Sequence, residues 1–141
     1  MFTSVILGAG KSTRMKANKS KLLFNIAGKP VINHIVSSLK HAKAKHNICV
    51  INNSSAELKK LLETEKVSFV YQKILDGTAG AVRAALKSKK NSNSKLLILC
   101  GDIPFITSSS IKKLISKLSN YDAVVGTVEL ESPKGYGRII R

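Results

Sequence analysis

The chain has 141 residues, of which 43% are hydrophobic, enough for one compact domain with a sizeable core. No apolar run approaches the roughly 18 residues of a membrane span, and no basic region precedes the first run, so we expect neither membrane insertion nor a secretory signal. The net charge of +16 suggests a polyanionic partner, but 5% aromatic residues and no Trp leave little to stack on bases, so we expect a solvated lysine surface and no dedicated nucleic-acid site.

Apolar runs alternate with helical patterns along the chain. Strands are predicted at residues 2–7, 48–51, 67–71, 96–100 and 123–130, and another is predicted to begin at residue 135. Helices are predicted at residues 31–44, 55–63, 78–88 and 108–118. This alternation predicts an α/β fold with a mostly parallel sheet that helices cover on both faces.

The two cysteines, Cys49 and Cys100, each lie in an apolar run that is predicted to be a buried strand. Buried thiols in a domain of this size are typical of reduced core cysteines. We therefore expect a cytoplasmic protein.

The loop after the first strand carries the first functional signal, because ligands of open α/β sheets bind beyond the carboxyl ends of the strands. It reads Leu7-Gly8-Ala9-Gly10-Lys11-Ser12-Thr13-Arg14-Met15, and Lys21 follows. Glycines let backbone N–H groups approach a phosphate, and the three cations add positive charge. We predict that this loop cradles phosphates.

A P-loop is the alternative interpretation, since Gly10-Lys11-Ser12 matches the end of that motif. The motif requires a further Gly five positions earlier, where this chain has Val5 inside the predicted strand. A long helix should also follow the Ser directly, and residues 15–20 are poor helix formers. We therefore favour a phosphate loop of another kind.

Gln72, Gly77 and Thr78 lie where the third strand ends and a helix begins. The free N–H groups of a helix N-terminus can face a ligand, and Thr78 is a candidate cap for that helix. A simple capped helix that binds nothing is the alternative interpretation.

Asp102 follows the predicted strand at residues 96–100, between Gly101 and the pair Ile103-Pro104. A carboxylate at the carboxyl end of a buried strand is a suitable oxygen ligand for Mg²⁺, which needs only one or two carboxylates plus phosphate oxygens. The alternative is that Asp102 caps the following turn. We favour the metal site.

Several segments, in this order, resemble the signature of the sugar-phosphate nucleotidyltransferase family. They are the glycine loop through Arg14 and Met15, Lys21-Leu22-Leu23, Ala27-Gly28-Lys29-Pro30-Val31, Gly101-Asp102-Ile103-Pro104 and Gly135-Tyr136-Gly137-Arg138-Ile139. Within the family, the chain is most similar to the N-terminal uridylyltransferase domain of the bacterial bifunctional N-acetylglucosamine-1-phosphate uridylyltransferases. The resemblance implies a Rossmann-like, three-layer α/β/α nucleotidyltransferase fold.

The resemblance also implies a role for each matching residue. Catalysis would fall on Arg14, Lys21 and Lys11, and metal binding on Asp102, with Mg²⁺ as the cofactor. Substrate binding would fall on Leu7, Gly8, Ala9, Gly10, Gln72, Gly77, Thr78, Gly101 and Gly137, with uracil recognised by Gln72, Gly77 and Thr78.

This chain departs from the family pattern at three places. Ser12 stands where the family usually has Gly, and Ser20 precedes Lys21 where the family commonly has Pro. The family often has Gly-His or Ala-His after the Thr, and this chain has Ala79-Gly80. The last change weakens the assignment of the nucleotide.

The function that the resemblance implies is the joining of UTP and N-acetylglucosamine 1-phosphate into UDP-N-acetylglucosamine, with release of pyrophosphate, for cell-envelope synthesis. The alternatives are a related cytidylyl- or guanylyltransferase, a truncated nucleotide-binding protein without catalysis, and a basic nucleic-acid-binding domain. Residues 1–141 match only the N-terminal portion of the family's domain. We therefore expect a fold that lacks its C-terminal part, with an open sheet edge suited to a second copy of the chain.

Overall fold

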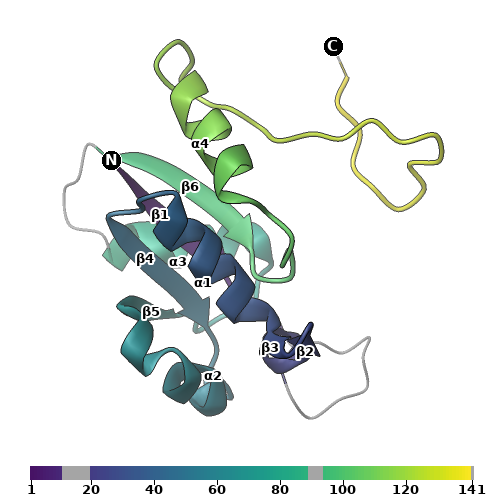
Figure 1. Cartoon of the computed structure of the whole chain (residues 1–141). Coiled ribbons are helices and arrows are strands. Elements are labelled where there is room, and N and C mark those ends of the chain that lie inside the picture. Colours follow the sequence, from purple (N-terminus) through teal and green to yellow (C-terminus); the bar gives the residue numbers. More distant parts are fainter. Residues whose placement is uncertain (11–19, 89–93, 141) are drawn as a thin grey trace.

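A computed structural model of the chain describes residues 1–10, 20–88 and 94–140, which build one parallel sheet between two helical layers (Figure 1). The strands of the sheet are β1 (Phe2–Leu7), β4 (His46–Ile51), β5 (Val67–Tyr71) and β6 (Lys95–Cys100). Their order across the sheet is β5-β4-β1-β6, and every neighbouring pair is parallel. The predicted α/β class with a mostly parallel sheet is confirmed.

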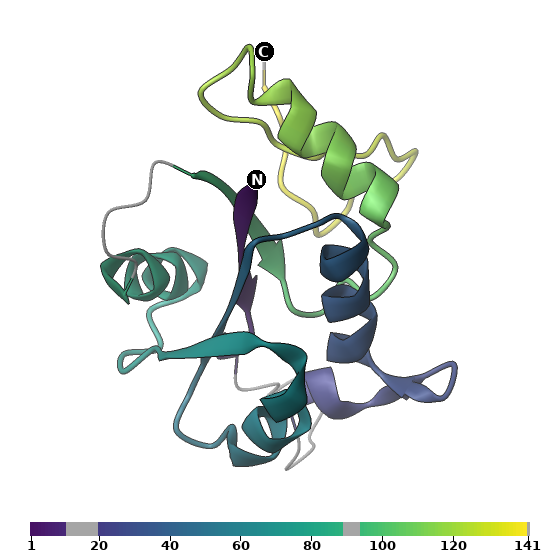
Figure 2. The ribbon, with the colours of Figure 1, turned by 60° about the vertical axis from the view of Figure 1, so that its left-hand side comes forward.

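Within the described residues, four α-helices flank the sheet, and short elements connect them. The helices are α1 (Val31–His41), α2 (Ala56–Leu61), α3 (Thr78–Ser88) and α4 (Ser108–Lys117). The short elements are η2 (Lys21–Leu23), η3 (Glu63–Glu65) and the small antiparallel pair β2 (Asn25–Ile26) and β3 (Lys29–Pro30). Figure 2 shows α3 on one side of the sheet and α1 and α4 on the other, which is the predicted three-layer arrangement.

The larger part of the core lies under α1. This helix buries apolar side chains three and four residues apart, such as Ile32, Ile35 and Leu39, against the sheet. Pro30, which lacks an N–H, stands just before its first turn. The helix ends at His41, three residues earlier than predicted, because the backbone turns to a φ of +62° at Lys43.

The opposite face of the sheet carries a smaller core under α3. Val5 and Val50 pack there against Ala81 and Ala85, whose short side chains let the helix lie close to the strands. Ile98 belongs to the same face of β6, and 45% of its surface stays exposed. The sheet is therefore covered less completely at its β6 edge.

The predicted strands at residues 123–130 and from residue 135 are wrong. After α4 the chain extends away from the sheet (Figure 1), and no described residue of this segment belongs to a strand. A strand needs a neighbour that pairs with its backbone N–H and C=O groups, and this segment has none among the described residues. Val125 and Val128 are accordingly 71% and 69% exposed.

The prediction that both cysteines are buried is half wrong. Cys49 lies in the inner strand β4 and is buried, whereas Cys100 is exposed. Cys100 is the last residue of the edge strand β6, where the sheet gives way to a cavity. Its sequence neighbours predict a buried strand but not its position at the edge of the sheet.

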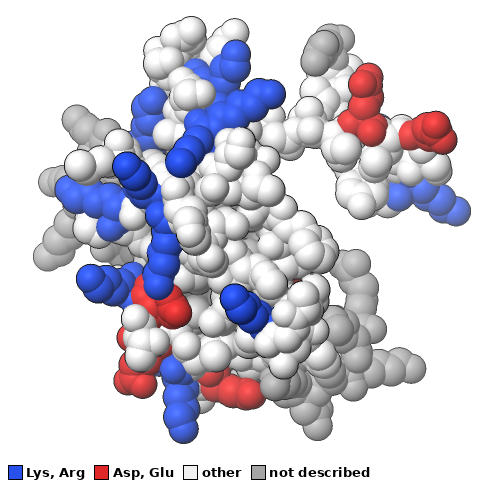
Figure 3. All heavy atoms as spheres, viewed as in Figure 1, with Lys and Arg blue, Asp and Glu red and all other residues white. Residues whose placement is uncertain are grey.

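None of the helices in the described part of the chain is long and apolar enough to cross a lipid bilayer. Figure 3 shows Lys and Arg side chains spread over several elements of one face, including α4.

Candidate active site

The carboxyl ends of the parallel strands meet at one edge of the sheet and surround a cavity of about 490 Å³. Nine of the predicted site residues line it, namely Leu7, Gly8, Ala9, Gly10, Lys21, Gln72, Gly77, Thr78 and Asp102. They come from segments far apart in the sequence, which the parallel topology brings to the same edge. Leu75, Ala81 and Cys100 also line the cavity, and the sequence analysis did not predict them as site residues.

Gly8 and Gly101 follow the strands β1 and β6, and their backbones approach the neighbouring strands closely. The Gly8 N–H donates to the Val50 carbonyl at 2.8 Å, and the Gly101 N–H donates to the Leu7 carbonyl at 3.0 Å. A Cβ at residue 101 would lie 2.8 Å from the Leu7 oxygen and 2.9 Å from Leu22 Cδ2. Gly101 is buried and does not line the cavity, so the structure places it in the packing beneath the cavity.

Asn52 clamps the glycine loop, and the sequence analysis missed it. Its Nδ2 donates to the Ala9 carbonyl at 2.8 Å, which fixes the loop from the neighbouring strand β4. The Asn52 Oδ1 accepts from the Ser54 N–H and the Ser55 hydroxyl, each at 2.9 Å. The available signal was the run Asn52-Asn53-Ser54-Ser55 directly after a buried strand.

Lys21 and Asp102 form an ion pair at the mouth of the cavity, and the Lys21 ammonium donates to Asp102 Oδ2. Both side chains stay partly exposed, at 36% and 45%. The carboxylate that was predicted to bind a metal therefore holds a cation of the chain. Within the described residues, no group of three or more His, Cys, Asp and Glu residues could hold a metal ion. A single carboxylate nevertheless fits Mg²⁺, which takes most of its other ligands from phosphate and water.

Gln72 is almost completely buried at the end of β5, and its amide nitrogen makes two hydrogen bonds. Nε2 donates to Asp76 Oδ1 at 2.9 Å and to the Gly77 carbonyl at 3.0 Å. Gly77 has a φ of +90°, which favours glycine, and its carbonyl accepts from the Ala81 N–H at 3.2 Å. We predicted Thr78 as the cap of α3. In the structure Thr78 is the first helical residue, and Gly77 precedes the first turn.

A second, more apolar cavity of about 690 Å³ adjoins the first, and both are lined by Lys21 and Asp102. Its other walls include Phe24, Ile103 and Phe105. The ion pair therefore lies between the cavity beside the glycine loop and one that is largely apolar.

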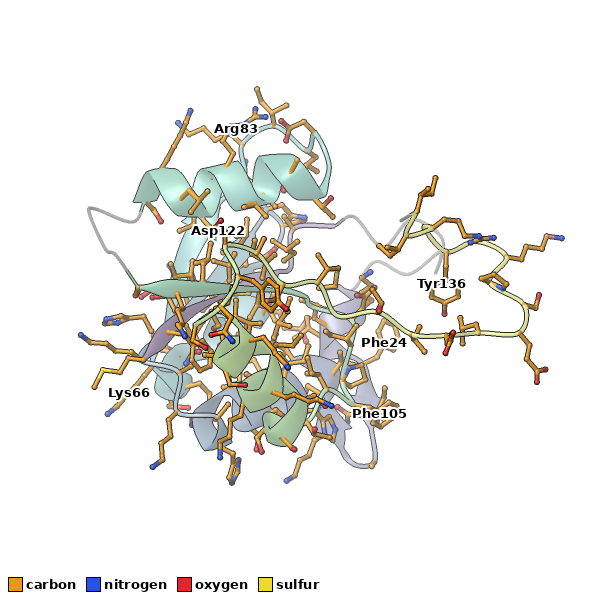
Figure 4. All side chains as sticks on the ribbon, turned by 90° about the horizontal axis from the view of Figure 1, so that it is seen from above. Phe24, Lys66, Arg83, Phe105, Asp122 and Tyr136 are labelled. Carbon is orange, nitrogen blue, oxygen red and sulfur yellow. The ribbon has the colours of Figure 1, made fainter. Side chains whose placement is uncertain are left out.

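Gly137 does not lie at this site in the structure. It belongs to the segment after α4, which Figure 4 shows at Tyr136 well apart from Phe24 and Phe105. Arg138 folds this segment locally, because its guanidinium donates to the Pro133 carbonyl at 2.7 Å and to the Tyr136 carbonyl at 2.6 Å. The predicted catalytic residues Lys11 and Arg14 lie outside the described residues.

Comparison with known proteins agrees with this arrangement. The family model described as the MobA-like NTP transferase domain matches residues 4–135. The bifunctional protein GlmU of Staphylococcus haemolyticus is 36% identical over 140 residues, and that of Buchnera aphidicola from Schizaphis graminum is 36% identical over 137 residues. These alignments cover 98% and 97% of this chain but only 31% and 30% of the relatives, so the chain spans less than a third of their length.

Solved structures show the same fold. A Methanothermobacter nucleotidyl transferase matches with a TM-score of 0.66 at 20% identity, over 82% of this chain and 57% of that one. Rv0371c from Mycobacterium tuberculosis, in a structure with manganese, matches with a TM-score of 0.66 at 17% identity, over 82% of this chain and 58% of that one. At these identities the matches establish the fold alone.

Proposed function

Because this chain belongs to the family of MobA-like NTP transferase domains, we propose that its nucleotidyltransferase site takes UTP and N-acetylglucosamine 1-phosphate as substrates. A phosphate oxygen of the sugar phosphate attacks the α-phosphorus of UTP, the bond to the β-phosphate breaks, and UDP-N-acetylglucosamine and pyrophosphate are the products. The observation that carries the proposal is one cavity lined by the glycine loop, Gln72, Lys21 and Asp102. The similarity to GlmU proteins along 98% of the chain supports the choice of substrates.

Positioning and charge stabilisation supply most of the catalysis in reactions of this kind. The backbone of Gly8, Ala9 and Gly10 borders the space for the triphosphate, and Lys21 neutralises the phosphate under attack. Asp102 would hold Mg²⁺, and the bound ion would supply neutralisation of phosphate oxygens. Lys11 and Arg14 follow this loop in the sequence, and we assign them to the departing pyrophosphate.

The base belongs at the other end of the same cavity, where Gln72, Gly77 and Thr78 meet the N-terminus of α3. Hydrogen-bonding groups that are fixed by the protein discriminate between bases, because a wrong partner leaves a buried polar group unpaired. We assign uracil to these residues. A cytidylyl- or guanylyltransferase is the alternative, and competition between UTP, CTP and GTP for binding distinguishes it from a uridylyltransferase.

A nucleotide-binding protein without catalysis is the second candidate function. The observation in its favour is that Gly137, one of the residues assigned to substrate binding, lies in the segment after α4, which extends away from the sheet (Figure 1). If catalysis is present, we place the product in cell-envelope synthesis in the cytoplasm, and a second copy of the chain is a candidate partner.

Release of pyrophosphate from UTP, N-acetylglucosamine 1-phosphate and Mg²⁺ tests the proposal. Asp102→Ala should abolish turnover, whereas Asp122→Ala, which removes an exposed carboxylate of the extended segment, should leave it unchanged. Turnover that depends on Asp102 supports the transferase. UTP binding without turnover supports the second candidate, and the absence of both refutes the uridylyl assignment.

A further inference from the structure

The amide of Gln72 is held in one orientation by two oxygen atoms. Its Nε2 donates to the Asp76 carboxylate and to the Gly77 carbonyl. A carboxylate and a carbonyl accept hydrogen bonds and cannot donate them, so the opposite orientation would place the amide oxygen against two acceptors. The chemistry of these partners therefore identifies the amide nitrogen of Gln72.

The amide oxygen of Gln72 is then the polar atom that this side chain can offer to a ligand. Among the described residues, the buried side-chain N and O atoms without a hydrogen-bond partner comprise Asn33 Oδ1 alone. Gln72 Oε1 is not one of these buried unpartnered atoms, and it accepts no hydrogen bond from the described residues. This oxygen therefore retains accessible surface. Gln72 itself lines the cavity. A ligand in this cavity meets an acceptor at Gln72.

Asp76 occupies its place because residue 80 is glycine. A Cβ on Gly80, one turn along α3, would lie 1.5 Å from Asp76 Oδ1, a distance that would force the carboxylate out. The Arg83 guanidinium lies on the next turn, 3.8 Å from Asp76 Oδ2, and offsets the charge of the carboxylate. Gly80 is also the position at which the resembling family often has His. The absence of a side chain there makes room for the carboxylate.

We infer that Asp76 is a positioning residue that fixes Gln72 as a hydrogen-bond acceptor for the ring N–H of a bound nucleobase. This inference rests on the proposed binding of UTP. Uracil presents N3–H at the position where cytosine has an unprotonated nitrogen, so a fixed acceptor favours UTP over CTP. Without Asp76 only the Gly77 carbonyl holds this orientation, so the amide reverses more readily and can then donate to cytosine.

Binding of UTP and CTP to the whole chain, measured by titration calorimetry with Mg²⁺, tests the inference. The wild-type protein should prefer UTP. In Asp76→Asn the new amide can donate to the Gln72 oxygen, so the UTP-to-CTP affinity ratio should fall by about 3- to 10-fold, the worth of one hydrogen bond. Gly80→Ala, which expels the carboxylate, should lower the ratio in the same direction, and Asp122→Asn should leave it unchanged.

The ratio separates positioning from structural damage, because damage weakens both nucleotides alike. In a Gln72→Ala background, Asp76→Asn should have no further effect on the ratio, since Asp76 acts through Gln72. A wild-type preference for UTP that Asp76→Asn and Gly80→Ala leave intact overturns the inference while the proposed function stands. A wild-type protein that binds neither nucleotide overturns the proposed function and this inference together.

Discussion

Replacing Lys21 with Met should strengthen metal binding at Asp102, because the lysine ammonium holds the carboxylate that we assign to the metal. The two side chains are 36% and 45% exposed, so the pair lies in a strongly screened environment. Pairs of this kind contribute about 0.2–1 kcal/mol, and their loss corresponds to about a 1.4- to 5-fold gain in metal affinity. Removing a positive charge beside the incoming cation acts in the same direction.

Titration of the protein with Mn²⁺, followed by electron paramagnetic resonance of the free ion, measures this affinity without any nucleotide. Lys40→Met is the matched control, because Lys40 pairs with Glu65 away from the cavity. It should leave the Mn²⁺ affinity unchanged, and Asp102→Asn should abolish the site. An affinity for Mn²⁺ that is equal or lower in Lys21→Met would refute the reasoning.

Four further predictions follow from single contacts. Asn52→Ala releases the glycine loop and should weaken UTP binding by about 3- to 10-fold in calorimetry, the worth of one hydrogen bond. Iodoacetamide should label Cys100 in the folded protein and UTP should protect it, as read by mass spectrometry, while Cys49 stays unlabelled until unfolding. Gly101→Ala should lower the free energy of unfolding by about 1–3 kcal/mol in urea titrations, because its Cβ would meet backbone, whereas Gly10→Ala, whose Cβ would meet no atom of the described residues within 4 Å, should not. Burial raises the pKa of the Cys49 thiol from 9.0 to about 12. As the pH rises, the thiol therefore loses its proton in the unfolded chain before it does so in the folded chain. The contribution of the protonated thiol to the free energy of unfolding is complete below pH 9 and decreases above it. Between pH 9 and 12 the wild-type protein should lose up to about 1.4 kcal/mol per pH unit more than Cys49→Ala.

The sequence predicted the sheet and its helices well where local patterns carry the information. The strand β5 and the helix α3 have their predicted bounds, and β4 and β6 differ by one or two residues at their starts. The strand at residues 123–130 failed for a different reason. An alternating pattern describes the two faces of a strand, but it does not show whether a neighbouring strand is present to pair with it.

The site shows the same division. The glycine loop, Gln72, Lys21 and Asp102 could be placed at one edge, because parallel strands bring their carboxyl ends together. The clamp from Asn52 to Ala9 joins residues 43 positions apart, and no local pattern encodes that contact. The role of Asp76 depends on the missing side chain at Gly80, so it becomes visible only when both residues are placed in space.

The outer edge of β6 has a further consequence for how copies of this chain behave together in solution. In the described part of the chain, β6 pairs on one side only, with β1, and Ile98 stays exposed beside that open edge. Such an edge can template edge-to-edge aggregation. The charge of +16 opposes the approach of a second chain, and this repulsion reaches about 10 Å in 0.1 M salt but only about 3 Å in 1 M salt. The lysine excess thus acts as a colloidal stabiliser, and raised ionic strength exposes the edge to self-association.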